Sequence, residues 1–158
     1  MNTTKIRCNQ GFTLIELISV VAIMAITLGF GLPSFRSTMA ENRLTASVND
    51  MVIALQLARS TSIKQVIYAG VSIDSVADGS DEWYVFRNVS GVPANVMQRY
   101  STASGVKVTA TDETPRYRSD GRLTSAAPIT ISFTLADGSP ARRTLTIAPS
   151  GRVSVTNP

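Results

Sequence analysis

The chain has 158 residues and a formal net charge of +4, which suits one domain with an appendage. It contains no histidine, so the commonest general base and the commonest zinc ligand are missing. Its single cysteine is Cys8, which excludes a domain built on disulfides beyond residue 11. Because a glycine-rich phosphate loop and clustered carboxylates are missing too, we expect no enzyme activity, no cofactor and no metal site.

Residues 1–11 precede a long apolar run and carry only positive charges, Lys5 and Arg7. The run from Phe12 to Leu32 has 21 residues and one charge, Glu16. As a helix it would measure about 31 Å, the thickness of a bilayer core. The basic residues on one side place residues 1–11 in the cytoplasm and the rest of the chain outside. We therefore predict a leader peptide at 1–11 and a membrane-spanning helix at 12–33.

Glu16 is the one charged residue in this span. Inserting a carboxylate there costs roughly 2.5–3.5 kcal/mol, and the segment supplies no cation to pair with it. A partner must come from elsewhere, and the free amine that cleavage creates on a neighbouring subunit is the main candidate. The alternative is a glutamate near the membrane surface whose side chain extends outward to water.

Gly29, Gly31 and Pro33 lie together at the end of the span. Pro33 cannot donate a helical hydrogen bond to Gly29, and glycine weakens a helix, so we expect a kink or a locally unwound turn. The alternative is a simple helix end at the interface, but helical periodicity resumes immediately after Pro33.

Residues 34–66 keep a helical pattern. Apolar residues recur at spacings of four and three, which places them on one face of a helix. That stripe is too short for a coiled coil, so we expect it to pack on the sheet of the following domain. Its residues are Leu44, Val48, Met51, Leu55 and Ala58.

From residue 67 to residue 158 the pattern changes to short runs rich in β-forming residues, which predicts a β-rich head. Asp137-Gly138 predicts a hairpin turn between the last two runs. Trp83, Tyr84 and Phe86 are expected in the core or at its rim. The predicted strands are Val66–Ile73, Glu82–Asn88, Val106–Ala110, Ile129–Leu135 and Arg142–Ile147.

Two short segments of the head resemble each other. Residues 119–123 (SDGRL) and 149–153 (PSGRV) both place a glycine and an arginine before an aliphatic residue. We interpret each as a tight turn that enters a strand or a sheet edge.

The N-terminal features together resemble the class III signal of type IV pilins and type II secretion pseudopilins: a basic leader, the run from Gly11 to Glu16 (GFTLIE), and Pro33 after the apolar stretch. The resemblance implies cleavage after Gly11 by prepilin peptidase and N-methylation of Phe12. It also implies that Glu16 guides subunit assembly through the amine of a neighbour, and that the helix bends or unwinds around Pro33.

The head resembles the GspH/FimT-type family of minor pilins and pseudopilins, through residues 55–60 (LQLARS), 119–123 and 143–153. The resemblance implies an α+β, type IV pilin-like fold: a long N-terminal helix, transmembrane at 12–33 and amphipathic at 34–66, packed on an antiparallel β-sheet head at 67–158. It implies a bacterial inner-membrane subunit with a periplasmic head that joins other pilins at or near a filament tip.

Three functions are open to this head: a structural one, DNA binding, or recognition of a protein partner such as a secreted substrate or another minor pilin. Some FimT-like proteins bind DNA during natural transformation through basic residues near the C-terminus, and arginine suits phosphate because its planar fork donates bidentate hydrogen bonds. Those relatives tend to carry a second basic residue shortly after Gly-Arg, where this chain has Ser154. The alternative is an H-type pseudopilin of type II secretion with no DNA-binding role. The candidate DNA-binding residues are Arg142, Arg143, Arg152, Arg122, Arg116 and Arg118.

Overall fold

The structure is a computed structural model that describes residues 12–75, 81–88 and 94–157. Within these ranges, the side chains of residues 30–34, 75, 88 and 94 lie outside the description. The chain divides after Thr38 into two compact units, which are considered separately below.

A single helix, α1 (Leu14–Gln65), has 52 residues and continues from the first unit into the second. Thr13 caps its N-terminus, because the backbone N–H of Glu16 reaches both the hydroxyl (3.3 Å) and the carbonyl oxygen (3.1 Å) of Thr13. The predicted kink at Pro33 falls among the residues whose side chains are not described. The backbone is nevertheless assigned as helical across residues 30–34.

In the first unit, every described side chain from residue 12 to residue 29 is exposed, including Phe12 at 80% and Leu14 at 76%. A helix that is apolar on all sides is normally covered, either in the core of a large protein or in a membrane. Within the described residues, no helix has the length and apolar character needed to cross a membrane. The predicted span at 12–33 ends among residues 30–34.

In the second unit, α1 ends at Gln65, one residue before the end of the predicted helical segment 34–66. The helix stops there because Val66 takes a left-handed φ of 54°. The N–H of Ile67 then donates back to the carbonyl oxygen of Ser62 (3.2 Å), a common way for helices to end. A β-branched residue in this conformation cannot belong to a strand. The first strand therefore begins at Tyr68, two residues after its predicted start.

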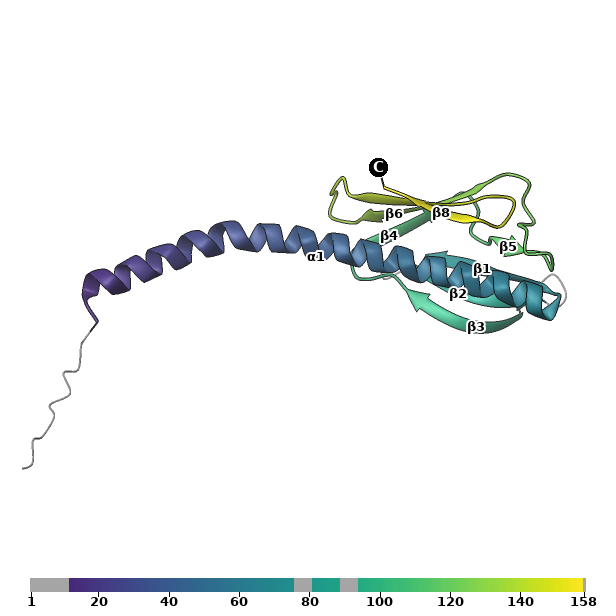
Figure 1. The fold of residues 1–158 in the computed structure, drawn as a ribbon, viewed down its shortest axis with the longest axis horizontal. Helices are drawn as coiled ribbons and strands as arrows, with labels where there is room; N and C mark the ends of the chain where they lie inside the picture. The colour runs from purple at the N-terminus through teal and green to yellow at the C-terminus, as the bar shows by residue number, and fades with distance from the viewer. Residues whose placement is uncertain (1–11, 76–80, 89–93, 158) are drawn as a thin grey trace, which may run out of the picture. The chain divides into compact units, whose positions relative to one another are not determined.

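Two four-stranded antiparallel sheets follow, with strand orders β3-β2-β1-β5 and β4-β6-β7-β8 (Figure 1). Two of these strands, β3 and β5, were not predicted, and β8 was expected only as the strand or sheet edge that the turn at residues 149–153 enters. The strands are β1 (Tyr68–Ser75), β2 (Asp81–Asn88), β3 (Ala94–Ser101), β4 (Val106–Ala110), β5 (Arg116–Tyr117), β6 (Ile129–Leu135), β7 (Arg142–Ile147) and β8 (Val153–Thr156).

One hydrophobic core joins the second half of α1 to both sheets. All five residues of the predicted helical stripe are buried, as are the inward-facing residues of β6, whose burial alternates along the strand. Trp83 of β2 connects the sheets, because its ring stacks on Tyr100 of β3 (6.0 Å) and meets the edge of Phe133 of β6 (6.4 Å). The α+β fold predicted from the sequence is thus confirmed, with two sheets forming the head.

Candidate functional site

Positive charge gathers at the end of the head where α1 stops. Gln65, the last residue of α1, accepts a hydrogen bond from Arg87 of β2 (3.3 Å), and Gly70 pairs with Arg116 of β5 at the same end of the first sheet. Among the described residues, seven positive side chains and one negative one lie there. We call this group the basic end: Arg59, Lys64, Arg87, Arg116, Arg118, Arg122 and Arg152, with Asp120 as the acidic residue.

The other end of the first sheet is acidic. Asp74 and Glu82 face each other across β1 and β2, and the N–H of Ile73 donates to the carbonyl oxygen of Glu113 (2.8 Å), which brings that residue alongside. The first sheet is therefore electrically polarised along β1. A polyanion would be attracted to the basic end and repelled from this one.

The two sequence segments that resemble each other are indeed two matching turns at the basic end. In the first, the N–H of Gly121 donates to the carbonyl oxygen of Arg118 and the N–H of Arg118 to that of Arg122, both at 2.8 Å. In the second, Gly151 and Ala148 make the corresponding bonds at 2.8 and 2.9 Å. Both glycines have a left-handed φ, 77° and 81°, which the turn requires and which favours glycine.

Arg59 of α1 bonds to both turns. Its Nε–H donates to the carbonyl oxygen of Gly121 (3.0 Å), and its Nη2 donates to that of Ser150 (3.3 Å). The turns also contact each other, since the N–H of Leu123 donates to the carbonyl oxygen of Pro149 (3.0 Å). One side chain from the helix thus ties together two loops from distant parts of the sequence.

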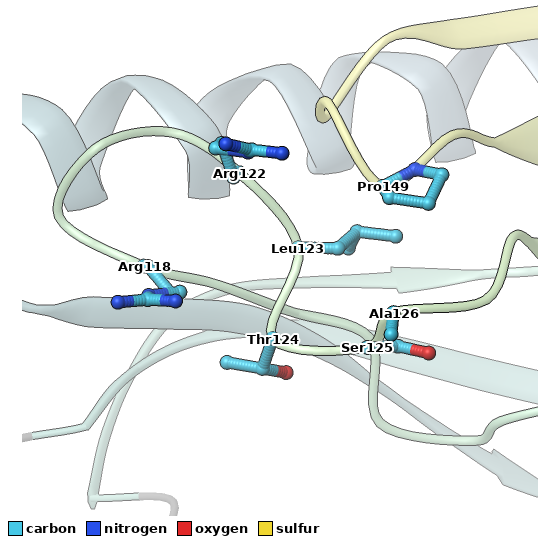
Figure 2. Close-up of a pocket in the computed structure, with 7 residues that line it drawn as sticks. All are labelled: Arg118, Arg122, Leu123, Thr124, Ser125, Ala126 and Pro149. Carbon is cyan, nitrogen blue, oxygen red and sulfur yellow. The ribbon is translucent and has the colours of Figure 1, made fainter.

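A hollow of about 350 Å³ opens beside the first turn, where Arg118 and Arg122 stand on its two arms and Leu123 and Pro149 form an apolar wall (Figure 2). Thr124 and Ser125 line it too, but their hydroxyls donate to the carbonyl oxygens of Arg116 and Ala127. The arginines therefore supply the strongest donors. Within the described chain, neither Arg118 nor Arg122 has an ion pair, so both guanidinium groups can bind an anion.

A second hollow of about 220 Å³ lies between α1 and the other turn, lined by Arg59, Gln56, Tyr117, Arg152 and neighbouring residues. Tyr117 is fully buried, and its hydroxyl has no hydrogen-bond partner among the described residues. Burial raises the pKa of Tyr117 to about 12, against the smaller opposing effect of the Arg59 charge. The phenol is therefore neutral at physiological pH and cancels none of the positive charge around it.

The structure separates the six predicted DNA-binding arginines into two groups. Arg116, Arg118, Arg122 and Arg152 lie at the basic end, whereas Arg142 and Arg143 begin β7 and pair with Thr134 and Phe133. At roughly 3.4 Å per residue, β7 carries the chain about 17 Å from Arg142 to the start of the second turn. The six residues therefore do not lie in one cluster.

Arg59 is the residue at the junction of the two turns that the sequence analysis does not single out. The sequence analysis includes it only within residues 55–60 (LQLARS), because it lies beside the apolar stripe of the helix and not on it. A signal was present nonetheless: Arg59 follows Leu55 by one helical turn, so it borders the buried face, where a long cationic side chain can reach the edge of the core. No group of three or more acidic, histidine or cysteine residues suited to a metal occurs in the described chain.

At the other end of the chain, Glu16 has a local partner that the sequence analysis did not anticipate. The hydroxyl of Thr13 donates to the Glu16 carboxylate, at a long 3.4 Å, and both residues are exposed. This contact is a variant of the helix capping box and leaves most of the carboxylate's bonding capacity free. Phe12 is exposed as well, while Gly11 and the Pro33 side chain lie outside the description.

Comparisons with known proteins agree with this architecture. A family model described as type II transport protein GspH matches residues 47–151, and one described as the prokaryotic N-terminal methylation motif matches residues 6–32. No sequence among curated proteins matches the chain.

Two solved structures share the fold. The type IV minor pilin FimU of Pseudomonas aeruginosa is 18% identical, with a TM-score of 0.62 over 73% of this chain and 89% of its own. The minor pseudopilin EpsH of the type 2 secretion system of Vibrio cholerae is 16% identical, with a TM-score of 0.59 over 73% of this chain and 98% of its own. At such identities the likeness is one of fold.

Proposed function

The chain belongs to the GspH family of type II transport proteins, and from this premise we propose that it is a minor subunit of a type IV pilus or of a type II secretion pseudopilus. In this proposal, prepilin peptidase cleaves after Gly11, the amine of Phe12 is methylated, and residues 12–33 hold the subunit in the bacterial inner membrane with its head in the periplasm. The subunit then joins other pilins near the filament tip.

One observation carries this proposal: the first half of α1 exposes apolar side chains on all sides, and most of it lies within the match to the N-terminal methylation motif over residues 6–32. Lipid and neighbouring pilin helices are environments that would cover such a surface. The capping contact with Thr13 leaves the Glu16 carboxylate able to pair with the N-terminal amine of a neighbouring subunit.

Replacing Glu16 should separate the charge of this residue from its capping role. We expect Glu16→Gln, which keeps an oxygen acceptor but no charge, to lower incorporation into filaments by about tenfold or more, because an ion pair in an apolar environment is lost. Incorporation is measured as the fraction of subunit in sheared filaments, and processing as the mass of the mature chain.

Thr13→Ala is the matched control. It removes the cap hydroxyl, at a cost of about 1 kcal/mol to the helix end, but leaves the carboxylate in place, so incorporation should stay near the unsubstituted level. If Glu16→Gln assembles normally while Thr13→Ala does not, the residue acts through helix capping and the assembly role assigned to it is wrong.

A second function is supported by the positive charge gathered at the basic end: binding of DNA there. We propose that the exposed guanidinium groups of Arg118, Arg122 and Arg152 contact the phosphate backbone without sequence preference. Such binding releases counterions and weakens steeply as salt rises. The departure at Ser154 leaves β8 without the second basic residue of those relatives, and the cations of the first turn can take its place.

The separation of the arginines into two groups supplies the test. Full-length protein in detergent micelles is titrated against fluorescent duplex DNA across a salt series. We expect Arg118/Arg122/Arg152→Ala to weaken binding more than tenfold and to reduce the salt slope by about 3, one for each lost phosphate contact. Arg142→Ala with Arg143→Ala should change affinity by less than about threefold, through long-range charge alone.

Equal losses in the two variants would place DNA elsewhere on the head or indicate attraction by net charge only. If the unsubstituted chain does not bind even at low salt, the DNA-binding function is excluded and the filament function remains.

A further inference from the structure

We infer that Arg59 is a positioning residue that holds the two glycine turns against each other, so that Arg122 and Arg152 bind phosphate as one coupled site. The inference rests on the proposed DNA binding and goes beyond it, because it assigns a role to a residue that need not touch DNA itself. It also explains why two similar turns, from separate parts of the sequence, occur at the same place.

The contacts of Arg59 are made to backbone and not to anions. Its side chain is half-buried, and its Nε and Nη2 groups bond to the carbonyl oxygens of Gly121 and Ser150. Because these acceptors are neutral, and because Arg59 has no ion pair within the described residues, the guanidinium keeps its full charge. Arg59 therefore fastens the turns and adds to the positive potential around them.

The two turns touch at their glycines. A Cβ atom on Gly151 would overlap the carbonyl oxygen of Gly121 and would lie 3.1 Å from Arg59 Nε. Gly121 is equally enclosed, since a Cβ there would lie 2.7 Å from Ile63. Arg59 sits at this junction, and both turns are fixed to α1 as well as to each other.

The exposed arginines follow these glycines directly in the chain. Arg122 comes after Gly121 and Arg152 after Gly151, so the junction fixes the distance between their backbones. Holding binding groups in place before the ligand arrives reduces the entropy lost on binding. The two arginines should then contribute more together than the sum of their separate contributions.

A double-mutant cycle measures this coupling. Full-length chain in micelles is titrated with duplex DNA for Arg122→Ala, Arg152→Ala and the pair, first in the natural background and then in Arg59→Gln. In the natural background we expect a coupling factor of roughly fivefold between the arginines, as for groups in one network. In the Arg59→Gln background the factor should fall to about one, the value for independent groups.

Lys64→Gln is the matched control, because it also removes one positive charge from α1 at the basic end but makes no bond to either turn. It should weaken binding through charge and leave the coupling factor unchanged. Arg59→Lys keeps the charge without the planar fork, so it should lose much of the coupling while keeping most of the salt slope. Amide hydrogen exchange at Gly121 and Gly151 should accelerate in Arg59→Gln and not in Lys64→Gln.

Coupling that persists in Arg59→Gln, or that is absent from the natural background, overturns the inference while leaving DNA binding intact. Unchanged hydrogen exchange at both glycines overturns it as well. Lack of DNA binding by the unsubstituted chain overturns the proposed DNA function and with it the shared site, so the two failures are distinguishable.

Discussion

Gly151→Ala should destabilise the head by about 4 kcal/mol or more, through two effects that act at one position. The glycine has a φ of 81°, where an alanine is strained. Its added Cβ would also overlap the backbone carbonyl of Gly121, which cannot rotate away as a flexible side chain could. Unfolding by urea can be followed through Trp83, the only tryptophan of the chain and a fully buried one.

Gly138→Ala is the control for this prediction. Gly138 has nearly the same φ, 78°, but nothing lies within 4 Å of where its Cβ would be. It should cost only the backbone strain, about 1–2 kcal/mol. If both substitutions cost the same, the two turns are not in close contact and the junction at Arg59 is looser than described.

Trp83→Ala should cost about 3–5 kcal/mol of unfolding free energy, because it removes the largest buried side chain of the head from between the two sheets. The stacking on Tyr100 and the edge contact with Phe133 would be lost together. Circular dichroism during thermal unfolding measures the effect without the tryptophan signal.

Two further variants show whether packing is the cause. Trp83→Phe should cost much less than Trp83→Ala, because part of the volume is kept and the indole N–H has no hydrogen-bond partner within the described residues. Tyr84→Ala, on the next residue of β2 and half-buried, should cost about 1 kcal/mol. A small effect of Trp83→Ala would contradict the assignment of this ring as the contact between the sheets.

Strands covered on one face were predictable, and edge strands were not. β4, β6 and β7 have their predicted bounds because burial on one side imposes an alternating pattern on the sequence. β3 is an edge strand, exposed along residues 95–99, and its pairing with β2 shifts register near Phe86. β8 is also an edge and β5 has two residues, so neither leaves a pattern that can be read without the fold.

The candidate site was only partly predictable for a related reason. The resemblance between residues 119–123 and 149–153 correctly indicated two turns, because the glycine requirement is local. That the turns meet, and that Arg142 lies a strand length away from Arg152, depends on how the second sheet is paired. Arg59 could not be assigned because its acceptors are backbone carbonyls, which no residue type identifies.

The Arg59 junction also bears on when the head can fold. Its two hydrogen bonds join residues 62 and 91 positions apart in the chain, and contacts of such long range slow folding because a large loop must close first. The junction cannot form until residue 151 has left the ribosome. Its closure therefore follows synthesis of nearly all the described chain.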